Sequence, residues 1–335
     1  MPNALTTGYA TIFQRELDKQ VVAQATSGWM EDNAGLVRYS GGNEVKIPII
    51  NMDGLGDYDR ANGFVEGSVN LTYETKIMTM DRGRTFMLDR MDVDETNFVA
   101  TAANVMGEFQ RTKVIPEIDA YRYSSIASQA IEYEAKFRIG VAVGGYTPSV
   151  TEILTKLRED IYAIYDVAGE IPLVIIMNMQ AAAILENSAE LSKTLSVIDF
   201  TQGDIKTSVR AIDNNPIIKV PSLRMKTKYE FYSGKAEEGE GAGGFAPAEG
   251  AKTINWIICP RTAPIAVSKT DNIRIFTPEQ NQKADAWKID YRKYHDLWIK
   301  DNQFKAIRVN IKEAITTQDN TGSGSGDPQE GDPQE

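Results

Sequence analysis

Two runs of alternating apolar residues, separated by a glycine-rich stretch, constrain the fold more than any other feature of this chain. In the first run, Val45, Ile47 and Ile49 alternate with more polar neighbours, as in a half-buried strand. The stretch 51–68 then holds four glycines. The second run comprises Val69, Leu71, Tyr73, Phe86 and Leu88. This pattern predicts a long two- or three-stranded protrusion, which needs a partner surface because isolated hairpins are marginal in water.

The strongest helical pattern follows the protrusion. Phe98, Ala102, Val105 and Phe109 are spaced four, three and four residues apart, which places them on one helix face. Pro116 cannot donate an interior hydrogen bond, so we expect it to kink or restart the helix. Helical composition continues towards Ala130. The whole element would be about 45 Å long at helical rise, which is unusual for a compact enzyme core.

A separate α/β block begins after Gly144 and Gly145. Its first helix starts near residues 147–149 and carries one apolar face, formed by Ile153, Leu157, Ile161 and Ile164. Strand and helix then alternate. The remaining elements are a buried strand at 173–177, a helix at 180–185, a strand at 217–220 closed by Pro221, and a mobile glycine- and glutamate-rich loop at 233–250.

The chain then returns to strands, expected at 253–259, 263–267 and 273–276. A long alternating run follows, in which Trp287, Ile289 and Tyr291 share one face. After a turn near 300–302 the alternation continues at Ile307, Val309 and Ile311. The last segment, 318–335, is rich in Gly, Ser, Asp and Pro, which predicts disorder and is also typical of an appended linker or tag.

At the other end, residues 10–25 read as an amphipathic helix with a modest apolar stripe, typical of an arm laid on a neighbour. No secretory signal precedes it. The longest apolar run, 173–177, is far short of the roughly 20 residues of a membrane span. We therefore expect synthesis in the cytoplasm and no contact with a membrane.

Residue counts exclude several kinds of chemistry. The chain has one cysteine and one histidine, too few for a Cys/His zinc site. Cys259 lies in an apolar run and is expected to be a buried structural thiol, and His295 is expected to have a structural or surface role. The glycine-rich stretches lack the Gly-Lys-Ser/Thr ending of a phosphate-binding loop. The net charge of -11 disfavours tight sequence-specific DNA binding.

One dense group of carboxylates stands out, formed by Asp89, Asp92, Asp94 and Glu95. Such a group can bind a divalent metal or act as a general acid and base, although the glycine pattern of a calcium loop is missing. The alternative is structural: acids near a helix start complement the helix dipole and pair with nearby arginines. The arginines in question are Arg82, Arg84 and Arg90. We favour helix capping and ion pairing.

The order of these parts resembles the major capsid proteins of tailed phages, which have the Hong Kong ninety-seven type fold. Several stretches are similar to capsid sequences from phages and prophages of Gram-positive bacteria. They are residues 54–60, 81–84, 89–96, 116–122 and 284–296. The resemblance covers roughly residues 5–315 and rests on the combination of stretches, because none of them is a short catalytic signature.

The resemblance implies an α+β fold with a division into named parts. The N-terminal arm is residues 1–43, the extended loop 44–92, the peripheral domain with its spine helix 93–146 and 272–317, the axial domain 147–271, and the disordered tail 318–335. In this scheme the extended loop reaches over a neighbouring subunit. The axial-domain loops meet around the fivefold and sixfold axes of an icosahedral shell.

The implied function is structural: self-assembly into the icosahedral head that encloses double-stranded phage DNA, with location in the virion. The implied partners are copies of the chain as pentamers and hexamers, a separate scaffolding protein, a portal, and DNA contacted weakly and nonspecifically. No catalytic residue, cofactor or metal is expected, and noncovalent contacts are expected to lock the shell. The residues expected to make charged contacts within or between subunits are Arg82, Arg84, Arg90, Asp89, Asp92 and Glu95.

Three alternatives remain open. An encapsulin-like compartment would have the same fold but enclose protein rather than a genome, and the contents of purified particles would distinguish the two. A tail or connector protein would form rings or tubes. A carboxylate-dependent hydrolase would need two carboxylates that converge in a pocket.

Overall fold

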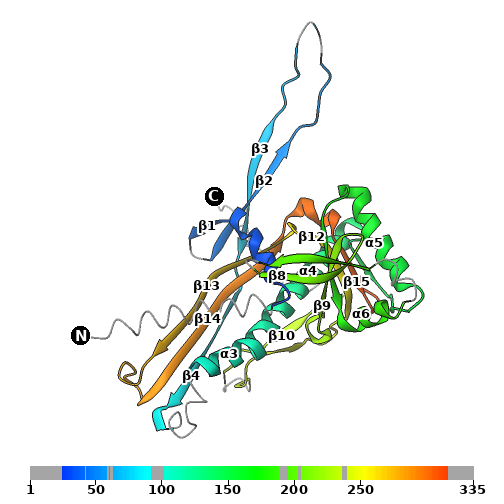
Figure 1. Ribbon diagram of the computed structural model, residues 1–335. Helices are drawn as coiled ribbons and strands as arrows, with labels where there is room; N and C mark the ends of the chain where they lie inside the picture. The colour runs from blue at the N-terminus through cyan, green and yellow to red at the C-terminus, as the bar shows by residue number, and fades with distance from the viewer. Residues whose placement is uncertain are drawn as a thin grey trace, which may run out of the picture. The chain divides into compact units, whose positions relative to one another are not determined.

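The computed structural model describes residues 25–41, 43–58, 60, 63–91, 102–188, 195–202, 205–235 and 240–315. The chain divides into two compact units (Figure 1). The first unit comprises Met1–Arg122, Asp199–Ser208 and Arg261–Asn302. The second comprises Tyr123–Ile198, Val209–Pro260 and Gln303–Glu335. Both combine helices with sheets, so the expected α+β class is confirmed.

A three-stranded antiparallel sheet of order β13-β14-β4 dominates the first unit. Its strands are β13 (Pro264–Phe276), β14 (Ala286–Ile299) and β4 (Met80–Asp89). The prediction of two strands at 263–267 and 273–276 was wrong, because β13 runs through both. The polar residues between them stay in the ladder with a register shift between Ser268 and Thr270.

The expected protrusion is a hairpin of β2 (Glu44–Met52) and β3 (Val69–Ile77), in a second sheet of order β1-β2-β3 with the short β1 (Arg38–Gly41). Its strands pair from Glu44 with Ile77 to Met52 with Val69. The strand that carries Phe86 and Leu88 does not belong to it, because β4 pairs with β14 instead. Figure 1 shows the hairpin as the two strands extending away from β13 and β14.

Next to the β13-β14-β4 sheet runs the predicted long helix, built from α3 (Ala102–Phe109), a π-helical turn η2 (Gln110–Val114) and α4 (Ile115–Phe137). The apolar spacing explains the wide turn. Phe109 and Val114 are five residues apart, one too many for an α-helix to place on one face. The extra residue in η2 brings both towards the sheet. The interruption therefore lies just before Pro116, where the proline was expected to disturb the helix.

Two apolar clusters form the core of the first unit. One contains Met106, Val114 and Ile118 of the helix packed on Ile289 and Tyr291 of β14. The other lies at the base of the hairpin and contains Val45, Ile47, Met78, Ile265, Val267 and Trp298. Gly83 permits close approach of β4 and β14, because a Cβ there would lie 2.9 Å from the carbonyl oxygen of Tyr291.

The second unit contains most of a mixed sheet of order β5-β15-β12-β6-β9-β8-β7, while the parts of β7 and β8 within Asp199–Ser208 belong to the first unit. Apolar residues at 153, 157, 161 and 164 are all buried, which confirms the predicted face of helix α5. All six residues of β6 are buried, as expected for a central strand covered on both faces. The elements are α5 (Ile153–Ala168), α6 (Met179–Glu186), β5 (Ala142–Gly144), β15 (Arg308–Ile311), β12 (Ile254–Pro260), β6 (Leu173–Asn178), β9 (Asn215–Val220), β8 (Ile205–Ile212) and β7 (Leu195–Gln202).

Individual residues mark the end of α5 and the start of α6. Gly169, with φ 75° and ψ 178°, has a positive-φ conformation that favours glycine, and its amide donates to the Tyr165 carbonyl at the end of α5. The side chain of Asn178 accepts a hydrogen bond from the Gln180 amide and caps α6. The turn expected near 300–302 is the 3₁₀-helix η6 (Asp301–Ala306). Two further 3₁₀-helices are η1 (Gly28–Leu36) and η4 (Ser222–Arg224).

The predicted loop at 233–250 is wrong for residues 245–247. These residues form β11 (Phe245–Pro247), which pairs with β10 (Tyr229–Phe231). The physical reason is aromatic packing, since the Phe245 ring lies 5.5 Å from that of Tyr229 and 6.2 Å from that of Phe231. Residues 236–239 of this stretch lie outside the described ranges.

Other predictions fall on residues that the structure does not describe. Nearly all of the arm helix at 10–25, the helix start around Glu95 and Phe98, and the tail at 318–335 are among them. Those predictions stand untested. In the described part of the chain, no helix has the length and apolar composition to cross a membrane.

Candidate assembly surface

The β2-β3 hairpin has one exposed apolar face, which we call the apolar hairpin face. It is built from three directly opposed pairs, Pro48 with Tyr73, Ile50 with Leu71, and Met52 with Val69. Five of the six side chains are exposed, from 42% for Tyr73 to 71% for Met52 and Val69. A stripe of this kind marks an interaction site rather than an ordinary soluble surface.

The opposite face of the hairpin is buried at its base and polar further out. Val45 and Ile47 are completely buried in the cluster around Ile265 and Trp298. On β3 the same face carries Asn70, Thr72, Glu74 and Lys76, opposed to Asn51, Ile49, Ile47 and Val45. One face of the hairpin thus anchors its base to the rest of the first unit. The apolar residues farther along the hairpin lie on the other face, and none of the described residues covers them.

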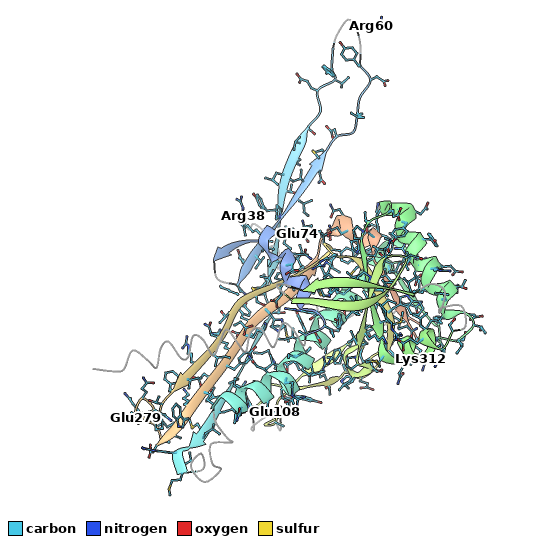
Figure 2. All side chains as sticks on the ribbon, in the orientation of Figure 1. Arg38, Arg60, Glu74, Glu108, Glu279 and Lys312 are labelled. Carbon is cyan, nitrogen blue, oxygen red and sulfur yellow. The ribbon has the colours of Figure 1, made fainter. Side chains whose placement is uncertain are left out.

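A polar clasp closes the strands where the hairpin opens into its tip. The carboxylate of Asp53 accepts hydrogen bonds from the backbone amide and hydroxyl of Ser68, both at 2.7 Å. These bonds lower the pKa of Asp53 below its ordinary value. Beyond the clasp, the rings of Tyr58 and Phe64 pack at 4.9 Å, and Leu55 is fully exposed. Figure 2 marks the tip by Arg60 and the base by Glu74.

A shallow apolar groove lies on the same unit, between β4 and the long helix. Phe86, Val105 and Phe109 form its floor. The Phe86 and Phe109 rings meet edge-on at 4.8 Å. The rim is polar and consists of Asn104, Glu108, Thr112 and Lys113. Glu108 is labelled on this helix in Figure 2 and pairs with Arg111 at 2.7 Å.

The predicted charged contact residues do not form one cluster. Arg82 donates to Glu117 of α4 at 2.7 Å, an ion pair within the chain. Asp89 accepts from the Met91 amide at 2.9 Å. The Arg90 amide donates to the Asp285 carbonyl at 3.3 Å.

Of the remaining residues in that prediction, Arg84 is half-buried on β4 opposite Tyr291. Asp92 and Glu95 lie outside the described ranges. Arg82 and Arg84 lie on β4, where the alternation along the sequence predicted a strand, and Arg90 follows it. The alternation did not reveal the partner of Arg82, which lies 35 residues further along.

The sequence reasoning also missed the apolar hairpin face as a functional feature. Its signal was present, since Ile50 and Met52 continue β2 as apolar residues in the opposite phase to Val45 and Ile47. Only the register, which sets them opposite Leu71 and Val69, shows that both strands contribute to one face.

Two side chains with a shifted pKa lie in the second unit, the buried Cys259 and the half-buried Asp160. Cys259 is 1% exposed, and burial raises its pKa to about 12, so the predicted structural thiol is confirmed. Asp160 accepts from Trp256 Nε1 at 2.8 Å, and burial raises the pKa of this carboxyl. Across the described ranges, no group of three or more His, Cys, Asp and Glu side chains is placed to hold a metal ion.

No family model matches the sequence, and no curated protein matches it. Solved structures do match the fold. The mature capsid of bacteriophage PhiM1 matches with a TM-score of 0.50 and 9% identity, over 81% of this chain and 82% of that one. The capsid of cyanophage P-SCSP1u matches with a TM-score of 0.50 and 8% identity, over 82% and 84%. This chain has the phage capsid fold.

A third match, to a chain of Mycobacterium phage Che8, has a TM-score of 0.47 and 14% identity over 83% of this chain and 90% of that one. At identities this low the matches concern backbone architecture, and those to the PhiM1 and P-SCSP1u capsids confirm the fold that the sequence resemblance implied. In the phage capsid fold, the apolar hairpin face is the described surface with the clearest need for a partner.

Proposed function

We propose that this chain is the major capsid protein of a tailed phage, which self-assembles into the icosahedral head enclosing the double-stranded DNA genome. The observation that carries the proposal is the apolar hairpin face, on a chain with the phage capsid fold. A long hairpin with an uncovered apolar stripe is poorly suited to a monomer. A second copy of the chain would cover it.

Assembly of this kind is additive. Burial of a large apolar side chain is worth about 1.5–3 kcal/mol relative to exposure, before the entropy of association is subtracted. One hairpin therefore makes a moderate, reversible contact. In a closed shell each subunit gives one hairpin and receives another, so many moderate contacts produce a stable particle.

The remaining parts of the proposal follow the resemblance. The peripheral and axial domains would divide the chain as the resemblance implies, with copies grouped as pentamers and hexamers. A separate scaffolding protein and a portal would take part in assembly. The net charge of -11 disfavours tight binding to DNA, so contact with packaged DNA would be weak and nonspecific. The role would be structural rather than enzymatic, in the virion, after synthesis in the host cytoplasm.

An encapsulin-like compartment is the alternative with the same fold. The two matches with a TM-score of 0.50 are both to phage capsids, which favours the virion. The contents of purified particles separate the two functions, because a head holds DNA and a compartment holds protein. Cryo-electron microscopy of tag-free protein, expressed with and without the neighbouring phage genes, would show closed shells, rings, tubes or a persistent monomer.

The decisive variant is Leu71→Glu, which places a charge in the middle of the apolar hairpin face. We expect closed particles to disappear in sedimentation and electron microscopy, while circular dichroism and the melting temperature of the subunit stay as in the wild type. Thr72→Glu is the matched control, because Thr72 is exposed on the polar face of the same strand. Assembly of Leu71→Glu at wild-type yield would contradict the proposal.

Arg84→Glu tests the predicted charged contacts separately. We expect it to reduce assembly more than subunit stability, as measured in the same two assays. If Arg84→Glu gives the wild-type yield of particles, Arg84 is not a contact residue. The proposed role of the hairpin would be unaffected by that result.

A further inference from the structure

The first described segment of the chain is held to the long helix by a buried carboxylate. Asp119 of α4 is completely buried. It accepts hydrogen bonds from the backbone amide and hydroxyl of Thr26, at 3.2 and 2.9 Å. It also accepts from the amide and hydroxyl of Ser27, at 3.1 and 2.6 Å. These four bonds fix the segment that leads into η1.

Charged side chains extend this attachment. Arg122, 1% exposed, donates to the carbonyl oxygen of Ser27 at 3.1 Å and forms an ion pair with Glu31 of η1. Lys293 of β14 is also buried, 2.6 Å from Asp271 of β13 and 3.8 Å from Glu31. Residues 26–31 are thus joined to α4 and to the β13-β14 pair by one network of charges, in which Asp119, Arg122 and Lys293 are buried and Glu31 and Asp271 are partly exposed.

The only histidine of the chain lies beside this network. His295 is 2% exposed on β14, and its Nδ1 has no hydrogen-bond partner among the residues that the structure describes. Its ring packs edge-on against Tyr121 of α4, with centroids 5.4 Å apart. Three cations act on it electrostatically, Arg122 of α4, Lys293 of β14 and Arg82 of β4.

The other titratable groups around the ring already have partners. Tyr121 donates to Asp296 at 2.6 Å, and Asp296 also accepts from the amide of Thr79 at 2.9 Å. Tyr294 donates to the Met78 carbonyl at 2.9 Å. Glu31 is shared between Arg122 and Lys293. Within the described ranges, no carboxylate accepts a hydrogen bond from Nδ1 of His295.

We propose that this network is an acid-sensitive latch, in which protonation of His295 releases residues 26–31 from α4 and β14. A new positive charge on His295 is buried among Arg122, Lys293 and Arg82, and it repels the two cations that hold Glu31. Opening lets water solvate the imidazolium. The latch lies within one chain, so it does not rest on the proposed function.

The sign of the pH dependence follows from linkage. Burial, with the three cations, holds the pKa of His295 in the latched state well below its ordinary value of 6.5. A pKa that is lower in the latched state than in the open state stabilises the latch above about pH 6.5. That contribution is lost progressively as pH falls through 6.5 towards the latched pKa.

The carboxyl of the latch responds in a lower pH range. Burial tends to raise the pKa of Glu31, but Arg122 and Lys293 outweigh it and leave the pKa below its ordinary value of 4.5. Glu31 therefore stays largely ionised above pH 4.5, in the range where protonation of His295 in the open state weakens the latch. Between pH 7.5 and 5 the histidine is the group in this network whose charge change opens the latch.

Hydrogen exchange of the full-length chain tests the proposal, with wild type and His295→Gln compared at each pH from 7.5 to 5. The glutamine is polar and cannot be protonated in this range. Peptides covering residues 26–36 are expected to exchange equally at pH 7.5. At lower pH the wild type is expected to exchange faster, by up to about tenfold for each pH unit below 6.5.

Lys288→Gln is the matched control, since Lys288 lies half-buried on the same strand, paired with Asp290. It is expected to behave as the wild type. A histidine-selective carbon-13 label gives one signal and reports protonation directly. Equal exchange of wild type and His295→Gln at pH 5 would overturn the proposal, as would protonation of His295 near pH 6.5 with residues 26–36 still protected.

Arg82→Gln keeps the test decisive if His295→Gln does not fold. Loss of one cation raises the latched pKa, which reduces the difference from the open state. We expect exchange to begin accelerating near pH 6.5, as in the wild type, but to level off at a higher pH and at a smaller total increase. Levelling off at the same pH as the wild type, or at a lower pH, would contradict the proposed role of His295.

Discussion

Gln110 is a polar side chain buried in an apolar environment. It lies in the π-helical turn between Met106 and Val114, and it is 2% exposed. Neither Nε2 nor Oε1 has a hydrogen-bond partner. An unpaired buried amide costs roughly 1–3 kcal/mol. The extra residue of the turn brings Phe109 to the apolar face and carries Gln110 into the core as a consequence.

Replacement of this amide by a hydrocarbon of similar size should stabilise the fold. We expect Gln110→Leu to raise the free energy of unfolding by about 1–2 kcal/mol, measured by urea denaturation. Gln129→Leu is the control, because the Gln129 amide donates to Ser125 at 2.9 Å and its loss brings no comparable gain. Destabilisation by Gln110→Leu would mean that the amide has a partner in the folded protein.

At the scale of elements, the long helix shows how one extra residue is accommodated. The five-residue step from Phe109 to Val114 is compatible with a continuous apolar face only if the helix widens locally. Removal of one exposed residue from the turn shortens the step to four, which an ordinary α-helix accommodates. The turn is thus a consequence of apolar spacing.

Deletion of Thr112 tests this explanation. Thr112 is exposed and makes one side-chain bond, to the Glu108 carbonyl at 2.7 Å. We expect the deletion variant to fold with a melting temperature within a few degrees of the wild type and with a regular helix. Deletion of Ser125, inside α4, should instead rotate one part of the apolar face by about 100° and destabilise the protein strongly. Equal loss of stability in both would contradict the explanation.

At the scale of the whole molecule, net charge and exposed apolar surface have opposite effects on association between copies of the chain. The net charge of -11 makes copies of the chain repel, whereas the apolar hairpin face draws them together. The screening length is about 30 Å at 0.01 M salt and about 8 Å at 0.15 M. Salt should therefore weaken the repulsion and leave apolar contacts largely intact.

We expect particle yield, followed by light scattering, to increase as salt rises from 0.01 to 0.15 M. The reason is that the dominant proposed contact is apolar and long-range repulsion is screened. A yield that falls with salt would show that ion pairs such as those proposed for Arg84 dominate assembly. Leu71→Glu should stay unassembled throughout the range, which separates screening from nonspecific aggregation.

Much of the secondary structure was predictable because its signals are local. The apolar spacing of α5, the continuous apolar run of β6 and the alternation of β2 each depend on neighbours within a few residues. The errors arose where distant residues decide. The β13 strand continues through polar residues because β14 pairs with it, and Phe245 enters a strand because Tyr229 and Phe231 pack against it.

The candidate assembly surface, too, was predictable from the sequence only in part. The sequence by itself determined that a hairpin with apolar residues exists and predicted a partner surface for it, because alternation and turn composition depend on consecutive residues. Only the tertiary structure decided that β4 leaves the hairpin for β14, that Arg82 pairs with Glu117, and that His295 is buried beside Arg122. Those facts depend on strand register and helix packing, which are set by the combined burial of residues far apart in the chain.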